Sequence, residues 1–180
     1  DNNIHFYDPV KKVDMLAIPS QNYQITTMID FNSPILGTQH ASLKHIADFK
    51  SQIGNCRTFC FLHEVEYLLE NNLIKGGDLS NAIVVVDKPV SQDELNHLAK
   101  VFNKETMEVK QEGILNNLQL NFPNEPARHK LLDVVGDLSL IGYPINAHII
   151  ASRPGHATNV EFAKKIKPIF ILIRYRQWRI

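Results

Sequence analysis

The sequence predicts an α+β fold, a two-layer sandwich in which helices pack on one face of a single sheet. Short stretches rich in β-branched residues alternate with stretches whose apolar residues have helical spacing. These stretches interleave without the regular strand–helix–strand period of a parallel α/β protein. The chain has 180 residues, of which 44% are hydrophobic, enough for one domain of ordinary size with its own core.

The first third of the chain contains two expected strands and a short helix. Residues 11–20 and 23–31 have strand composition, and apolar and polar residues alternate along the second. A proline and a glycine within 33–39 indicate a loop. Residues 45–54 are expected to form a short helix that Gly54 ends.

The middle third is expected to run helix, strand, helix. Apolar spacing within 58–77 predicts a helix that ends at its Gly-Gly pair, weakened by two asparagines before it. Residues 81–89 have the composition of a buried strand that Pro89 stops. Residues 91–102 open with Ser91 as a helix cap and carry acidic residues in the first turn.

The last third is expected to contain two helices and one strand. An extended stretch leads into a helix over 128–142, followed by a strand over 146–152. A Pro-Gly turn then opens a helix over 157–166. The apolar and basic tail, 167–180, is open to several interpretations: an edge strand, an interfacial anchor or a segment foreign to the domain.

Composition narrows the function classes. Lys plus Arg and Asp plus Glu balance at 19 each, so net charge gives no reason to expect nucleic acid or an anionic membrane as partner. No run approaches the ~18 apolar residues of a transmembrane segment, and no phosphate-binding glycine loop occurs. Cys56 and Cys60 have no second pair, so we expect free, partly buried thiols in a reducing cytosol.

The helix over 128–142 carries an unusual polar row. His129, Asp133 and Asp137 are four residues apart, about one helical turn, so they stack along one side while the apolar residues occupy the other. Three interpretations are open at this point: a solvated ion-pair face, a buried hydrogen-bond ladder, or part of a metal site.

A second histidine offers a partner for the deepest carboxylate. His156 follows a Pro-Gly turn at the start of a helix, where functional side chains are often held. A hydrogen bond from this ring to the Asp137 carboxylate would orient the ring and favour its protonated form, the arrangement expected of a general acid. His129 and Asp133 would suit zinc, but catalytic zinc takes three protein ligands plus water, and no third ligand is visible.

The motifs resemble one known family. The stretches "RHKLLDVVGDLSLIG", "ASRPGHATNVEFAKKI", "CRTFCFLHEVEYLLENNLIKGGDLSNAIVVV" and "TTMIDFNSPILGTQ" are similar to the second half of the zinc-dependent UDP-3-O-acyl-N-acetylglucosamine deacetylases of lipid A biosynthesis. The resemblance covers residues 4–166. It implies a chain that is the second of two similar domains, with an inserted segment for the acyl chain and the first domain absent. Some relatives are fused to a 3-hydroxyacyl-acyl-carrier-protein dehydratase, to which the tail 167–180 would lead.

The resemblance also assigns roles. It makes His129 and Asp133 two of the three Zn²⁺ ligands, and Lys130 a contact to the diphosphate or sugar of the UDP-linked acylated glucosamine. It makes Asp137 the support of His156, which protonates the leaving amine.

Further roles fall on the preceding segments. Thr58 would stabilise the tetrahedral intermediate, and Asp30 and Phe31 would lie near the sugar. The residues that would line the acyl passage are Phe59, Leu62, Val65, Ile74, Ala82 and Val84.

The third zinc ligand and the general base of this family belong to a Glu-His motif in the first domain, and no Glu-His pair occurs in this sequence. We therefore expect a cytoplasmic zinc amide hydrolase of which this chain supplies half the active site and is inactive alone. Two alternatives remain: a non-catalytic acyl- or lipid-binding domain, and an ordinary α+β domain in which the polar row is structural.

Overall fold

The structure is a computed structural model that describes residues 3–71, 81–109, 113–115 and 118–177. The chain divides into two compact units, each described here by itself. The first unit contains Asp1–Asp30, Thr38–Cys56 and Ala127–Ile180, and the second contains Phe31–Gly37 and Arg57–Pro126.

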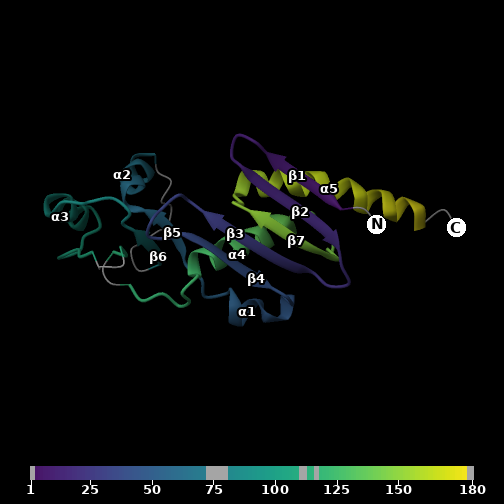
Figure 1. Ribbon diagram of the computed structural model, residues 1–180, viewed down its shortest axis with the longest axis horizontal. Coiled ribbons are helices and arrows are strands. Elements are labelled where there is room, and N and C mark those ends of the chain that lie inside the picture. Colours follow the sequence, from purple (N-terminus) through teal and green to yellow (C-terminus); the bar gives the residue numbers. More distant parts are fainter. Residues whose placement is uncertain (1–2, 72–80, 110–112, 116–117, 178–180) are drawn as a thin grey trace. The chain divides into compact units, whose positions relative to one another are not determined.

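The first unit is built on a five-stranded sheet (Figure 1). Its strands, in spatial order, are β1 (Ile4–Asp8), β2 (Val13–Pro19), β7 (Ala147–Ser152), β3 (Gln24–Asp30) and β4 (Thr38–Leu43). β3 and β7 pair in parallel, and every other neighbouring pair is antiparallel. The strands expected at 11–20, 23–31 and 146–152 are thus confirmed as β2, β3 and β7.

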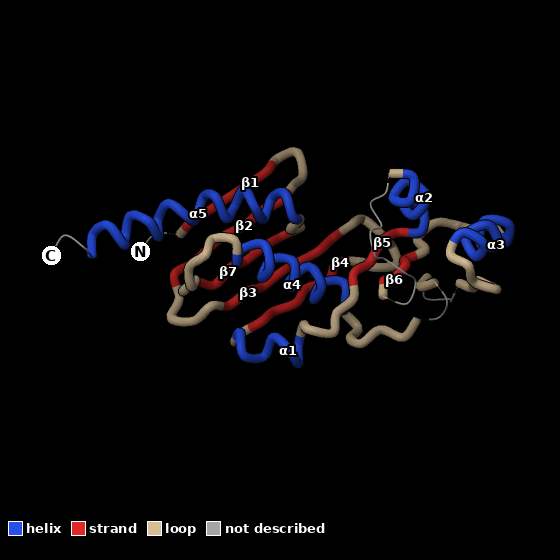
Figure 2. The backbone as a smooth tube through the Cα atoms, turned by 180° about the vertical axis from the view of Figure 1, so that it is seen from behind, coloured by secondary structure: helices blue, strands red, loops and turns tan. Residues whose placement is uncertain are grey.

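Two helices cover one face of this sheet, α4 (Glu125–Ser139) and α5 (His156–Gln177) (Figure 2). Alternate residues of β2 and β3 are buried, as expected of strands with one covered face. Leu131 and Leu138 of α4 and Phe162 of α5 are fully buried, each contributing about 1.5–3 kcal/mol through apolar burial. The predicted α+β class, with helices on one side of a sheet, is confirmed.

The second unit contains the short parallel pair β5 (Thr58–Phe61) and β6 (Ala82–Val85) with helices α2 (Leu62–Glu70) and α3 (Gln92–Val101). The prediction of one helix from residue 58 is wrong for its first four residues. They form β5 because Thr58↔Ala82 and the following pairs satisfy their backbone groups in a ladder that local spacing does not reveal. The Gly-Gly end expected at 76–77 lies outside the described residues.

Helix α3 follows its sequence signal closely. The Ser91 hydroxyl accepts from the backbone N–H of Glu94, and the Glu94 carboxylate accepts from the Ser91 N–H at 2.7 Å, a complete capping box. These bonds hold the pKa of Glu94 below its ordinary value. The short helix expected at 45–54 is also present, as a 3₁₀ turn, Ile46–Asp48, followed by α1 (Phe49–Gln52).

The strands β1 and β4 were not expected. Both are edge strands, paired on one side only, and few of their residues are buried, so their apolar signal is weak. The C-terminal segment also differs: α5 continues through Pro168 to Gln177, so residues 167–177 are helical rather than an edge strand. Among the described residues no helix is long and apolar enough to span a membrane. Cys56 and Cys60 are thiols that are not joined in a disulfide, as expected.

Candidate functional site

The polar row of α4 is organised around Asp133, whose side chain is 7% exposed. His129 Nδ1 lies 3.2 Å from the carbonyl oxygen of Cys56. Because a carbonyl only accepts, Nδ1 is the donor in this contact, and in a neutral ring Nε2 then has its lone pair. That Nε2 lies 3.5 Å from Asp133 Oδ1. The backbone of residue 56 therefore selects the tautomer in which His129 can act as a metal ligand beside Asp133.

The spacing of these two atoms fits a zinc ion. Two ligands bound at about 2.1 Å in tetrahedral geometry lie about 3.4 Å apart, close to the 3.5 Å between His129 Nε2 and Asp133 Oδ1. Imidazole nitrogen and carboxylate oxygen are also donors that zinc accepts. In the part of the chain that the structure describes, no group of three or more His, Cys, Asp or Glu side chains is arranged to hold a metal. The pair fits as part of a ligand set.

Lys130 and His156 both lie near the second oxygen of the Asp133 carboxylate, Oδ2. The Lys130 ammonium donates to Asp133 Oδ2 at 2.9 Å, and His156 Nε2 lies 4.0 Å from the same oxygen. A nearly buried carboxylate needs such compensation. Lys130 thus lies beside Asp133 and its ammonium is paired with that carboxylate, and its contact with the diphosphate or sugar stays a prediction.

The expected hydrogen bond between Asp137 and His156 is present. His156 is the first residue of α5, and its Nδ1 lies 2.9 Å from Asp137 Oδ2. The His156 side chain is 70% exposed, whereas that of Asp137 is 17% exposed. The imidazole is therefore accessible while the group that orients it is held within the fold.

The sequence reading missed Asn159, which lies in the first turn of α5. Its side chain is fully buried, and its Nδ2 donates to Asp137 Oδ2 at 2.8 Å. The available signal was its spacing three residues after His156, which places both side chains near one helix face.

A second missed group is the ion pair of Arg57 and Glu125. The Glu125 carboxylate is fully buried and accepts from Arg57 N and Nε, both at 2.9 Å, and from Asn121 N at 2.6 Å. Burial acts to raise the pKa of Glu125, but these hydrogen bonds and the guanidinium charge outweigh it and hold the pKa below its ordinary value. Arg57 directly precedes Thr58, and Glu125 opens α4.

Asp30, expected near the sugar, is paired with a residue that the sequence did not single out. Arg153 Nη2 donates to Asp30 Oδ2 at 2.7 Å, and the backbone N–H of Arg153 donates to the Met28 carbonyl at 2.8 Å. Arg153 has a φ of 54°, a left-handed conformation that is uncommon for a long side chain. Such strain often occurs at functional sites.

The remaining expected residues belong to the second unit. Thr58 is exposed at the start of β5. The rings of Phe31 and Phe59 meet edge to face with centroids 5.3 Å apart, and Phe31 is 42% exposed. Phe31 also meets the buried Phe61, with ring centroids 5.9 Å apart, so the three rings form one aromatic cluster of which Phe31 is the exposed member.

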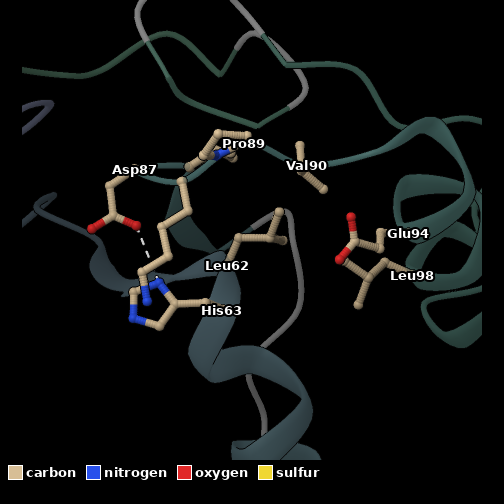
Figure 3. Close-up of a pocket in the computed structure, with 9 residues that line it drawn as sticks. Leu62, His63, Asp87, Pro89, Val90, Glu94 and Leu98 are labelled. Atoms are coloured by element: carbon tan, nitrogen blue, oxygen red, sulfur yellow. Dashed lines mark hydrogen bonds and ion pairs between the residues drawn. The ribbon is translucent and has the colours of Figure 1, made fainter.

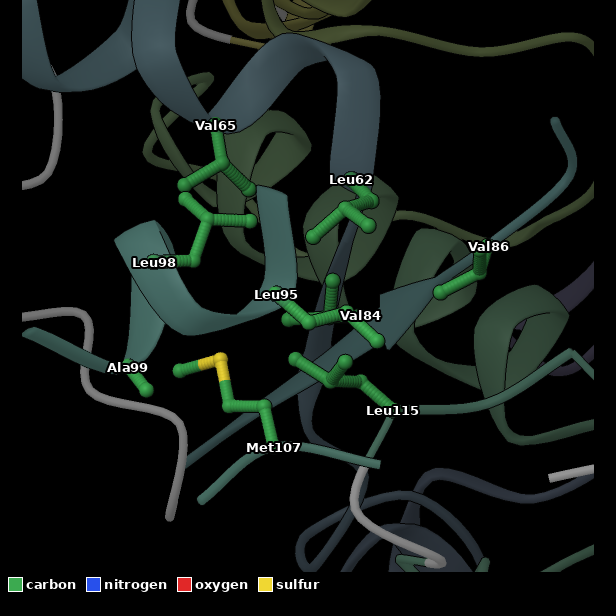
Figure 4. Close-up of a cluster of buried hydrophobic side chains, with 9 residues drawn as sticks. All are labelled: Leu62, Val65, Val84, Val86, Leu95, Leu98, Ala99, Met107 and Leu115. Carbon is green, nitrogen blue, oxygen red and sulfur yellow. The ribbon is translucent and has the colours of Figure 1, made fainter. Parts of the chain in front are cut away.

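The expected acyl-lining residues divide into two clusters. Leu62, Val65 and Val84 are buried together against Leu95 and Leu98 of α3 (Figure 4). Phe59 packs on a separate cluster of buried residues, Ala82 is partly buried, and Ile74 lies outside the described residues.

A pocket of about 110 Å³ adjoins the first of these clusters. Its apolar wall includes Leu62, Val90 and Leu98, and its rim carries the hydrogen-bonded pair His63–Asp87 (Figure 3). It is smaller than the ~150 Å³ cavity that accommodates benzene. Leu62 is the expected acyl-lining residue that contacts it.

Comparison with known proteins identifies similar chains. The family model described as LpxC, UDP-3-O-acyl N-acetylglycosamine deacetylase, matches residues 3–102 and 98–168. The bifunctional enzyme LpxC/FabZ of Chlorobaculum tepidum is 48% identical over 170 residues, which are 93% of this chain and 36% of that protein.

Two further relatives agree with this. The bifunctional enzyme LpxC/FabZ of Porphyromonas gingivalis is 46% identical over 89% of this chain and 35% of its own length. The UDP-3-O-acyl-N-acetylglucosamine deacetylase of Chlamydia pneumoniae is 37% identical over 84% of this chain and 46% of its own length. The chain thus spans between about a third and a half of the curated relatives it matches.

Proposed function

The chain belongs to the UDP-3-O-acyl N-acetylglycosamine deacetylase family, and we propose that it supplies half of a zinc-dependent active site that removes the N-acetyl group of a UDP-linked, 3-O-acylated glucosamine in lipid A biosynthesis. The observation that carries the proposal is the row along α4, in which His129 Nε2 and Asp133 Oδ1 are spaced as two ligands of one metal while Asp137 holds His156. We propose a cytoplasmic location for this reaction.

His129 and Asp133 would hold the zinc ion. Zinc bound there supplies Lewis-acid polarisation of the amide carbonyl and makes water a usable nucleophile near neutral pH. The third ligand and the general base are proposed to come from polypeptide outside this chain, as the family resemblance implies. The extent of the match to longer relatives supports this.

His156 is the proposed general acid. Its Nδ1–H is engaged by Asp137, so the proton that moves is the one on Nε2, which passes to the departing amine nitrogen. Asp137 keeps the ring oriented and stabilises the imidazolium from which the proton is given. Thr58 is proposed to donate its hydroxyl hydrogen bond to the oxyanion of the tetrahedral intermediate.

The substrate's two ends would be bound by different groups. Lys130 and the Asp30–Arg153 pair supply charged and polar contacts for the diphosphate and sugar. Phe31 and Phe59 present aromatic surface, and the cluster around Leu62, Val65 and Val84 supplies the apolar environment in which each buried CH₂ of an acyl chain contributes ~0.8 kcal/mol.

Acetate release from a UDP-linked, 3-O-acylated N-acetylglucosamine tests the proposal. We expect release when the chain is combined with the amino-terminal part of a relative such as that of Chlorobaculum tepidum, and none from either part alone. His129→Ala should abolish release by the combination. Substrate binding that is unaffected by His129→Ala and by zinc removal, with no acetate released, would instead indicate a non-catalytic acyl-binding domain.

A further inference from the structure

The Asp137 carboxylate has two donors among the described residues, and they approach from the same helix. His156 Nδ1 lies 2.9 Å and Asn159 Nδ2 lies 2.8 Å from Asp137 Oδ2. Both donors belong to the first turn of α5, whereas Asp137 belongs to α4. The carboxylate oxygen is therefore shared by an exposed ring and a buried amide.

The two donors differ in how firmly they are held. His156 is 70% exposed, so packing does little to fix its ring. Asn159 is fully buried, and its backbone N–H donates to the Gly155 carbonyl at 2.8 Å within the opening turn of α5. The buried amide is thus held by packing, whereas the ring has, besides Asp137, the long 4.0 Å contact of its Nε2 with Asp133 Oδ2.

We propose that Asn159 is a positioning residue for the proton-donating histidine: its amide fixes the Asp137 carboxylate, which in turn fixes the His156 ring with Nδ1 protonated and Nε2 left to meet the substrate. The inference rests on the proposed function, in which His156 is the general acid. Without the amide, the carboxylate is free to rotate about its Cβ–Cγ bond, and its remaining donor is an exposed ring.

The other end of the amide supports a positioning role. Asn159 Oδ1 is buried, and among the described residues no donor reaches it. Burying an unpaired acceptor opposes folding, so the amide is a poor choice for stability alone. Its Nδ2 is the end that makes a bond, and that bond goes to Asp137. Local violations of this kind are typical of functional sites.

The test measures the tautomer of the His156 ring by ¹⁵N NMR of the chain at about pH 9, where a free imidazole is neutral. The wild-type ring should be held as the Nδ1–H tautomer. In Asn159→Leu, which matches the amide in size but donates nothing, and in Asn159→Ala, the ring should show the tautomer mixture of an unconstrained imidazole. Phe162→Leu is the matched control, because Phe162 is a fully buried residue of α5 whose side chain can donate no hydrogen bond to Asp137.

Activity gives a second readout in the assembled enzyme. Loss of a group that supports an active-site residue typically costs about 10–100-fold, so both Asn159 variants should lower kcat by that factor with KM unchanged. An unchanged His156 tautomer in both variants would overturn the inference, whether or not acetate is released. Failure of both variants to fold while Phe162→Leu folds would make Asn159 a structural residue and would also overturn it. Absence of acetate release by the wild-type assembly would count against the proposed function. The role of Asn159 would then be judged from the His156 tautomer alone.

Discussion

At the scale of single residues, the buried charge of Glu125 is the most consequential group outside the proposed chemistry. Its carboxylate is fully buried and is compensated by the Arg57 guanidinium and by backbone and side-chain donors. Removing one partner of such a pair leaves the other charge buried and unpaired. The stability of the second unit should therefore depend on this pair more than on any exposed ion pair, such as Lys164–Glu161.

Glu125→Gln should lower the free energy of unfolding at pH 7 by about 3 kcal/mol, measured by urea denaturation. The folded-state pKa of Glu125 lies below its ordinary 4.5, so the stabilisation is fully present above about pH 4.5 and is lost as pH falls through the folded-state pKa. The wild type should therefore lose stability on acidification more steeply than Glu125→Gln. Glu161→Gln is the control and should match the wild type. If the free energy of unfolding fell equally with pH in the wild type and in Glu125→Gln, this account would be contradicted.

Some residues of the candidate site could be predicted from the sequence, and others could not. His129, Asp133 and Asp137 were visible because helical spacing alone aligns them, and the contact of Asp137 with His156 could be anticipated as the pairing of an apolar-flanked carboxylate. Asn159 was overlooked because its spacing three residues after His156 is a weak signal, since asparagine is an ordinary residue in the first turn of a helix. Arg57 and Glu125 are separated by 68 positions, and nothing local pairs them.

At the scale of elements, α4 carries both the packing of the first unit and the polar row. Its apolar side buries Leu131, Val134 and Leu138 completely, whereas Gly136 is exposed and a Cβ built there would contact nothing within 4 Å. A glycine inside a helix is less favourable than alanine by ~1 kcal/mol. A glycine at such a position is consistent with close approach of a ligand or of another polypeptide.

Gly136→Ala should therefore raise the free energy of unfolding by up to about 1 kcal/mol, measured by urea denaturation of the chain. If a ligand or a second polypeptide approaches α4 at this point, acetate release by the assembled enzyme should fall although the variant is more stable. A Gly136→Ala chain that is less stable than the wild type would contradict the open space that the structure shows around this position.

Helix α3 makes a comparable test in the second unit. Leu98→Ala removes a buried side chain from the cluster with Leu62, Val65 and Val84 and should cost about 2–4 kcal/mol. Its control is Val101→Ala on the same helix, where the side chain is 47% exposed and the cost should be below about 0.5 kcal/mol. Equal effects of the two substitutions, measured by thermal and urea denaturation, would contradict the packing of α3 on these residues.

Elements were predictable where local chemistry decides them. The Ser91 capping box identified α3, and alternation identified β2 and β3, because each signal acts within a few residues. β5 was taken for helix because Phe61, Val65 and Leu68 also fit helical spacing, and its strand state depends on β6, which lies more than 20 residues later. The edge strands β1 and β4 were missed because a strand with one partner needs little apolar alternation.

At the scale of the whole molecule, the chain spans between about a third and a half of the length of its curated relatives. The α+β class followed from the order of elements, but the division into two units did not, because the second unit begins and ends inside stretches that look continuous in the sequence. The metal pair on α4 is the feature on which the functional proposal most depends.

Zinc titration of the chain tests that pair most directly. The chain should bind one zinc ion, and His129→Ala and Asp133→Asn should each lower the affinity by more than about tenfold, because loss of even an outer-shell partner of a ligand costs about 10–100-fold and each variant removes or weakens a ligand itself. His5→Ala is the control, since His5 forms an exposed pair with Asp14 at 2.8 Å that has no proposed metal role. Equal zinc affinity in the wild type and all three variants would contradict the claim that His129 and Asp133 are two ligands of one catalytic metal.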